Sequence, residues 1–207
     1  MNTGLIAIGD VHCKTNAYYD IIKSNDCDSI QVGDFGFDIE HQWHLDNVDN
    51  SKHKVNFGNH DDYNFLNKPH SLGNFSYIDK YNLLSVRGAF SVDQYKRTEG
   101  IDWFRNEELN YNEMNLAIDL CELKKPKIIV SHDCPHEVRK HLFGIYEKSI
   151  TSNGLQGMFE VHQPNIWIFG HHHKSKNEVI NGTQFICLAE LEIYKKIRRK
   201  LYLISKH

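Results

Sequence analysis

Five short segments of this chain each end an apolar run with residue types that bind metal ions. They are Asp10-Val11-His12, Gly33-Asp34, Gly58-Asn59-His60-Asp61, Ser131-His132-Asp133 and Gly170-His171-His172-His173. Together they supply about as many oxygen and nitrogen ligands as two divalent cations require. Two such cations about 3.5–4 Å apart form the usual clamp for hydrolysing a phosphate ester. The pattern therefore indicates a class of reaction as well as a metal site.

The elements that must position these segments can be predicted from the spacing of apolar residues. Short apolar runs bounded by glycine, asparagine or aspartate predict buried strands at 5–8, 29–32, 55–57, 83–86, 127–130, 166–169, 178–180, 185–188 and 193–204. Helical spacing predicts helices at 15–24, with Thr15 as the N-cap, and at 112–124, ended by Pro126. Strands that alternate with helices predict an α/β fold with the helices outside.

Candidate ligands follow directly after five of these predicted strands, and they are Asp10, Asp34, Asn59, His132 and His171. In open α/β sheets, ligands bind at the carboxyl ends of the strands, so we expect these side chains to lie close together. Asp10 and His12 are two residues apart, as are His171 and His173. On extended backbone, residues i and i+2 point to the same side, so each pair is predicted to aim at one centre.

The order D-x-H, G-D, G-N-H-D, an isolated histidine after a strand, and G-H-x-H resembles the calcineurin-like metallophosphoesterase superfamily. The resemblance covers roughly residues 5–190 and suggests a small single-domain member of the prokaryotic or phage type. It implies a four-layer α-β-β-α sandwich, in which helices flank two mixed β-sheets, with residues 1–207 as a single domain. It also implies a dinuclear metal site.

The resemblance assigns ligands residue by residue. The first metal would be bound by Asp10, His12, Asp34 and His173, and the second by Asp34, Asn59, His132 and His171, so that Asp34 bridges the two. Mn²⁺ is the favoured ion, with Fe, Zn, Ni or Mg as alternatives, and carboxylate, imidazole and amide ligands suit such cations. Water that bridges two cations loses a proton readily, which would supply a hydroxide nucleophile near neutral pH.

The same resemblance gives two residues a catalytic role. His60 would lie outside the metal coordination, face the substrate and protonate the leaving alkoxide, a step that typically contributes about 10²–10⁴-fold to the rate. Asp61 would orient or polarise His60. The protein serine/threonine phosphatase branch has glutamate in place of Asp61 and an acidic-Arg-Gly run where this chain has Phe35-Gly36-Phe37, so that branch is disfavoured.

Two further residues are candidates for contact with the substrate. Arg97 lies in a segment that resembles small bacterial and phage members, and its guanidinium would match a phosphate through two hydrogen bonds. The alternative for Arg97 is an ion pair with Asp93, Asp102 or Glu107. His172 is the middle of three histidines and should point away from both neighbours, so it is predicted to be structural or substrate-facing rather than a ligand.

Composition limits the partners. The 207 residues carry a net charge of -3, with 40% hydrophobic and 25% charged residues, which is ordinary globular usage. This balance does not indicate a nucleic-acid or membrane partner, and no run of about 18 apolar residues is present. Only the basic stretch 195–200 would suit nucleic acid, and a solvated strand end is its simpler interpretation. Five cysteines without a CxxC pair, and no signal-peptide pattern, favour a cytoplasmic location.

The sequence thus predicts a hydrolase that acts on a phosphate-ester substrate, either a phosphomonoester or a phosphodiester, with a small nucleotide-type molecule favoured by analogy. A nuclease and a protein phosphatase of the same fold are the alternatives. A non-catalytic, metal-stabilised binding scaffold is the alternative from a different class. His41, Trp43 and His44 either line the substrate cleft or cap the sheet edge. The oligomeric state, and whether residues 35–52 form a lid, are left open.

Overall fold

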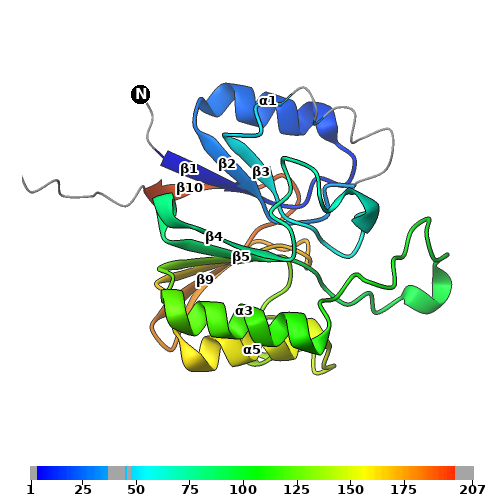
Figure 1. The fold of residues 1–207 in the computed structure, drawn as a ribbon, viewed down its shortest axis with the longest axis vertical. Helices are drawn as coiled ribbons and strands as arrows, with labels where there is room; N and C mark the ends of the chain where they lie inside the picture. Colours follow the sequence, from blue (N-terminus) through cyan, green and yellow to red (C-terminus); the bar gives the residue numbers. More distant parts are fainter. Residues whose placement is uncertain (1–3, 37–44, 46–47, 199–207) are drawn as a thin grey trace, which may run out of the picture.

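The computed structural model describes residues 4–36, 45 and 48–198 of the chain. The strands within these residues form two sheets (Figure 1). Most of the segment 35–52, including His41, Trp43 and His44, lies outside the described residues. The predicted end of the last strand, 199–204, and the end of the basic stretch also lie outside them.

The first sheet combines three parallel strands and one antiparallel strand in the described chain. Its order is β10-β1-β2-β3, with β1 at Gly4–Ile8, β2 at Asp28–Gln31, β3 at His53–Val55 and β10 at Ile193–Arg198. β1, β2 and β3 are parallel, and β10 runs antiparallel to β1. β1 lies inside this sheet and residues 5–8 are buried on both faces, which is why they form a continuous apolar run.

The second sheet has the order β4-β5-β6-β7-β9-β8 within the described residues. Its strands are β4 at Phe75–Ile78, β5 at Leu83–Val86, β6 at Ile128–Ser131, β7 at Ile166–Phe169, β8 at Lys176–Ile180 and β9 at Thr183–Cys187. β5, β6, β7 and β9 are parallel, and the edge strands β4 and β8 are antiparallel to their neighbours. Both sheets are therefore mixed.

Helices cover the outer faces of the two sheets, as Figure 1 shows. Helix α1 at Thr15–Asn25 lies over the first sheet, where Tyr18 and Ile22 join a buried cluster with Ile6 and Ile8. Helices α3 at Tyr111–Lys124, α4 at His136–Phe143 and α5 at Ile150–Val161 lie on the side of the second sheet. The predicted four-layer α-β-β-α sandwich is confirmed.

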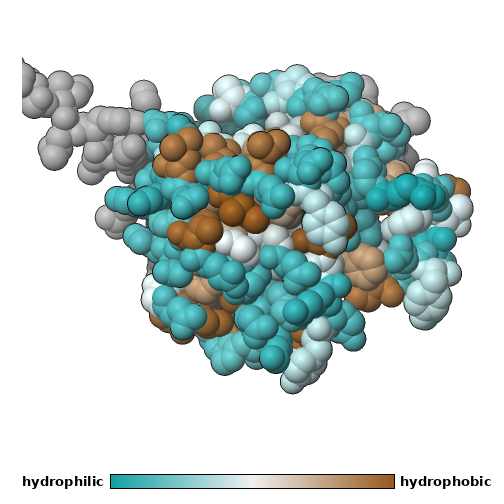
Figure 2. Space-filling view, turned by 60° about the horizontal axis from the view of Figure 1, so that its bottom comes forward, coloured by the Kyte–Doolittle hydropathy of each residue, from teal (hydrophilic) through white to brown (hydrophobic). Residues whose placement is uncertain are grey.

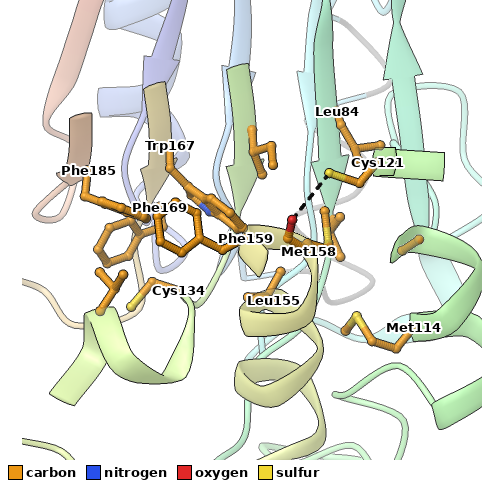
Figure 3. Packing of buried hydrophobic residues seen from close by; sticks show 14 of the residues in the cluster. Leu84, Met114, Cys121, Cys134, Leu155, Met158, Phe159, Trp167, Phe169 and Phe185 are labelled. Carbon is orange, nitrogen blue, oxygen red and sulfur yellow. Dashed lines mark hydrogen bonds between the residues drawn. The ribbon is translucent and has the colours of Figure 1, made fainter. Parts of the chain in front are cut away.

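Two further apolar layers hold the sandwich together. Between the sheets, Ala7 and Ile30 of the first sheet pack in one cluster with Val130 and Ile168 of the second. Between the second sheet and its helices, Trp167, Phe169 and Phe185 face Leu155, Met158 and Phe159 of α5 (Figure 3). Because the inner strands of each sheet are buried on both faces, their ends are the part of the fold where polar side chains can gather.

The surface is mainly polar on the face shown in Figure 2, where the largest group of hydrophobic side chains lies at the upper left and smaller groups lie elsewhere. Large apolar side chains that are exposed include Tyr95 and Ile101 in the loop between β5 and α3, and Leu123 near the end of α3. Among the helices of the described chain, none combines the length and the apolar character that crossing a lipid bilayer requires.

Several elements differ from the sequence-based expectation. Helix α1 begins at Thr15 itself, and the N-cap is Lys14, whose side chain makes no capping hydrogen bond. Helix α3 begins one residue earlier than predicted, through a capping box between Asn110 and Glu113. Strand β4 and helices α4 and α5 were not predicted. In α5, Gly154 lowers helix propensity but allows Met114 of α3 to pack closely, because a Cβ there would collide with its side chain.

Candidate metal centre

The candidate ligands lie after the carboxyl ends of five parallel strands that belong to two different sheets. Asp10 and His12 follow β1, Asp34 follows β2 and Asn59 follows β3, all in the first sheet. His132 follows β6, and His171 and His173 follow β7, in the second sheet. The two sheets thus present their strand ends to one common place.

One group of donor atoms comes from Asp10, His12, Asp34 and His173, and these atoms all lie within 4.8 Å of one another. The Nε2 atoms of His12 and His173 are 3.0 Å apart. Asp10 Oδ2 lies 3.4 Å from His173 Nε2 and 3.9 Å from His12 Nε2. Asp34 Oδ2 lies 3.8 Å from His12 Nε2. This is the set that the resemblance assigns to the first metal.

A second group shares Asp34 with the first and adds His132 and His171, again within 4.8 Å. Asp34 Oδ2 lies 3.2 Å from His132 Nε2. Asn59 Oδ1 lies 3.2 Å from the same nitrogen, so it joins this group through its amide oxygen. The structure therefore brings together all seven residues that the sequence nominated as ligands, with Asp34 common to the two groups.

The donor set fits divalent cations. Asp34 Oδ1 accepts a hydrogen bond from the backbone N–H of His60 at 2.9 Å, whereas Asp34 Oδ2 is buried and has no hydrogen-bond donor. A buried acceptor without a partner costs about 1–3 kcal/mol, and a cation would satisfy it. Two ligands at right angles around an octahedrally coordinated ion, each about 2.1 Å from it, are about 3 Å apart. The His12 to His173 and His132 to Asn59 spacings agree with that value.

Electrostatics at the site reflects a buried carboxylate among imidazoles. Burial opposes ionisation of Asp34, but His132, His60 and His12 hold the pKa of its carboxyl well below the usual range. Burial likewise opposes protonation of His132, but Asp34 outweighs it and raises the pKa of His132 to about 9. Burial lowers the pKa of His171 to about 3, so its imidazole is neutral, which is the form that binds metals. A cation would replace the proton that Asp34 favours on His132.

The backbone that carries these side chains is not extended. His12 and Cys13 have φ of 45° and 64°, and His171 and His173 have φ of 65° and 51°. The prediction that each D-x-H or H-x-H pair lies on extended backbone is therefore wrong, although both members of each pair reach one group. Left-handed turns after β1 and β7 re-aim the side chains, a conformation that is uncommon outside glycine.

Glycine is required where the site is most crowded. Gly170 precedes His171, and a Cβ at this position would collide with Asp10 Oδ1. Gly33 precedes Asp34, has φ of 127° and faces the ring of His132. The two glycines allow backbone from each sheet to approach a ligand of the other.

His60 is contacted by an arginine. Arg97 Nη1 lies 3.0 Å from His60 Nδ1, and because a guanidinium only donates, Nδ1 must accept and Nε2 carries the proton of the neutral ring. Burial lowers the pKa of His60, Asp34 opposes that shift and Arg97 adds to it. Asp61, which we expected to orient His60, is buried and accepts the backbone N–H groups of Gly36 and Gly58 at 2.7 and 2.8 Å. Asp61 thereby joins the loops after β2 and β3.

Arg97 forms the ion pair that was its alternative role. Its Nε and Nη2 donate to the two oxygens of Asp93 at 2.8 and 2.9 Å. This face of the guanidinium is the one that would hold a phosphate through two hydrogen bonds, and in the structure Asp93 occupies it. The loop that carries both residues is the green segment that projects from the body in Figure 1.

His172 lies apart from the two ligand groups. Its ring stacks on Phe143 with centroids 4.0 Å apart, and its Nε2 lies 3.2 Å from Asp133 Oδ1. The side chain is 6% exposed, which favours the structural interpretation over the substrate-facing one. Asp133, Cys134 and His172 also offer three donor atoms within 4.8 Å. Arg139 already pairs with Asp133 at 3.2 Å, however, which makes this a satisfied structural cluster.

The sequence assigned no role at the metal site to two residues next to Asn59. Asn59 Nδ2 donates to Ser91 Oγ at 3.0 Å, and Ser91 Oγ donates to Glu107 Oε2 at 2.6 Å. Ser91 belongs to the G-A-x-S-x-D run that resembles small members of the superfamily, and Glu107 lies further along the same segment. That run was the only signal in the sequence that could have pointed to them.

Comparison with known proteins supports the fold. No protein-family model matches the chain, and no curated protein sequence matches it. The phosphopantetheinyl hydrolase of Mycobacterium tuberculosis superposes with a TM-score of 0.57 at 14% identity, covering 99% of this chain and 98% of that one. A putative 5'-nucleotidase of Staphylococcus aureus gives a TM-score of 0.60 at 13% identity, covering 93% of this chain and 50% of the other. At these identities the likeness shows a shared fold.

Proposed function

We propose that this protein is a metal-dependent phosphoesterase that hydrolyses a phosphomonoester or phosphodiester. The observation that carries the proposal is the position of Asp34, whose buried Oδ2 has no hydrogen-bond donor. This oxygen lies 3.8 Å from His12 Nε2 of one ligand group and 3.2 Å from His132 Nε2 of the other. One carboxylate oxygen between two such groups suits a pair of divalent cations. Mn²⁺ is our first choice, with Fe, Zn, Ni or Mg as alternatives.

The chain's own residues would position these ions and the substrate. Asp10, His12 and His173 complete one group around Asp34, and Asn59, His132 and His171 complete the other. When bound, the ions would supply Lewis acidity toward the phosphoryl oxygens and would activate a water as the nucleophile. His60 holds a proton at Nε2, because Arg97 donates to Nδ1, and we assign it the role of donor to the leaving oxygen.

For the substrate we favour a small nucleotide-type phosphate ester. The net charge of -3 does not provide the long basic groove that a nuclease needs to hold a strand. The putative 5'-nucleotidase that shares the fold agrees with this class without establishing it. The following experiment distinguishes this function from three alternatives, which are a nuclease, a protein phosphatase and a non-catalytic scaffold.

The test is a panel of substrates with metal-free and Mn²⁺-loaded protein. We expect two equivalents of Mn²⁺ to bind and p-nitrophenyl phosphate, its bis ester, cyclic nucleotides or dinucleotides to be hydrolysed. Asp34→Asn should release metal and abolish turnover, whereas Asp119→Asn, an exposed aspartate on α3, should change neither. Activity confined to single-stranded DNA or to phosphopeptides would move the assignment to a nuclease or a protein phosphatase. Metal binding without hydrolysis of any substrate would indicate the non-catalytic, metal-stabilised scaffold instead.

A further inference from the structure

The Asn59 side chain has two ends of similar size and opposite chemistry. Its carbonyl oxygen is a metal ligand, whereas its NH₂ group only donates hydrogen bonds. If the amide turned over, the NH₂ group would face the cation and the ligand would be lost. Asn59 is 3% exposed, so buried neighbours rather than bulk water must select the orientation.

Ser91 and Glu107 provide that selection through three hydrogen bonds. The backbone N–H of Ser91, which only donates, is 2.8 Å from Glu107 Oε1. The Ser91 hydroxyl donates its single proton to Glu107 Oε2 at 2.6 Å. With its proton used in this way, Ser91 Oγ only accepts from Asn59, and it does so from Nδ2 at 3.0 Å. The oxygen Oδ1 is consequently turned toward His132 Nε2, 3.2 Å away.

The hydrogen-bonded chain Asn59–Ser91–Glu107, called the relay from here on, is buried, and a backbone hydrogen bond holds it in place. Ser91 and Glu107 are 2% and 3% exposed. Gly88 donates its N–H to Phe57 O at 2.9 Å, which fixes the segment before Ser91 beside the loop that carries Asn59. The bonds between Ser91 and Glu107 join two points of the chain between β5 and α3 that are 16 residues apart, and so close off the segment between them.

We propose that Ser91 and Glu107 are positioning residues that fix the Asn59 amide with its oxygen toward the metal group shared by Asp34, His132 and His171. This inference rests on the proposed metal-dependent function and extends it to two residues that touch neither metal nor substrate. Residues that orient a metal ligand in this way typically contribute about 10–100-fold to metal affinity or activity.

The first experiment is a Mn²⁺ titration of metal-free protein by calorimetry. Ser91→Ala removes the relay and should weaken one of the two equivalents by about 10–100-fold. Ser91→Thr keeps the hydroxyl and should bind both equivalents close to the wild-type affinity. The matched control is Ser85→Ala, which removes a buried hydroxyl that has no hydrogen-bond partner and should leave both affinities unchanged.

Glu107→Gln tests the direction of the relay. The Ser91 N–H would retain the glutamine oxygen, so the new NH₂ group would face Ser91 Oγ and the hydroxyl proton would no longer be committed to residue 107. The same equivalent of Mn²⁺ should weaken. Glu108→Gln is the matched control, because Glu108 accepts a backbone N–H from Thr151 outside the relay.

A readout without metal separates this inference from the proposed function. In ¹⁵N-resolved spectra, the side-chain NH₂ of Asn59 should exchange slowly in the wild type and in Ser91→Thr, and faster in Ser91→Ala or Glu107→Gln. Wild-type exchange and wild-type Mn²⁺ affinity in folded Ser91→Ala and Glu107→Gln would overturn the relay. If the wild-type protein bound no Mn²⁺, the proposed function would fail, while the amide exchange would still decide whether the relay orients Asn59.

Discussion

At the scale of single residues, the two oxygens of Asp34 have different environments. Oδ1 accepts the backbone N–H of His60, and Oδ2 faces imidazole nitrogens without a donor of its own. The same turn therefore fixes the shared carboxylate and places the ring of His60 next to it. Arg97 holds that ring through Nδ1 while Asp93 holds Arg97. The position of His60 is thus set by neighbours on both sides.

A substitution of His60 separates metal binding from proton donation. His60→Asn should bind both equivalents of Mn²⁺, because His60 belongs to neither ligand group. Its turnover of an alkyl phosphate ester should fall by about 10²–10⁴-fold, whereas a p-nitrophenyl ester, whose leaving group needs no proton, should lose much less. His141→Asn is the control, since His141 is an exposed histidine paired with Glu178. Unchanged turnover of the alkyl ester would remove His60 from the mechanism.

At the scale of elements, the strands deliver the ligands and the turns after them aim the side chains. β1 and β7 end in left-handed turns, and the backbone of one sheet passes next to ligands of the other. Gly170 and Asp10 are the closest case, because a Cβ on Gly170 would occupy the position of Asp10 Oδ1. The geometry of the site therefore depends on the turns that follow the strands.

Gly170→Ala should displace Asp10 and abolish binding of one Mn²⁺ equivalent, with a loss of about 1–3 kcal/mol in the free energy of unfolding. The control for Gly170→Ala is Gly182→Ala, which changes a glycine in the turn between β8 and β9. Gly182 has φ of 84° and open space around its Cβ position, so alanine there should cost about 1–2 kcal/mol but leave metal binding intact. Calorimetric titration and urea unfolding measure both quantities. Wild-type Mn²⁺ binding by Gly170→Ala would refute the close-approach argument.

At the scale of the whole molecule, the two sheets meet at the ligand groups as well as at the apolar layer between them. Asp10, Asp34 and Asn59 come from the first sheet, and His132 and His171 come from the second. Cations bound by both sets would connect the two halves of the sandwich. The folded state would gain this connection and the unfolded chain would lack it.

Each bound equivalent of Mn²⁺, with the free ion at about 100 times its dissociation constant, should stabilise the protein by about 2.7 kcal/mol. For a chain of this length, that corresponds to a rise of roughly 5–10 °C in the midpoint of thermal unfolding. A chelator should reverse the rise, and Asp34→Asn should show none. Differential scanning calorimetry provides the measurement, and an equal rise in Asp34→Asn would place the stabilising ions elsewhere.

The sequence by itself determined the layers of the α-β-β-α sandwich and the set of residues predicted to bind metal. β1 and β7 could be predicted because burial on both faces leaves a continuous apolar run, and polar residues that end such runs stand out. For the same reason Asp10, Asp34 and His171 could be nominated from their position after a strand. Metal binding by these residues stays a prediction until the titrations above are done.

Only the tertiary structure decided which partners hold those ligands. Ser91 is 32 residues from Asn59 and Arg97 is 37 residues from His60, and no local period reports such contacts. For His172 the sequence indicated a structural role or a place facing the substrate, and only the fold showed its contacts with Phe143 and Asp133. Apolar patterning records how deeply a residue is buried, whereas the direction of a polar side chain depends on hydrogen-bond partners that folding brings from distant parts of the chain.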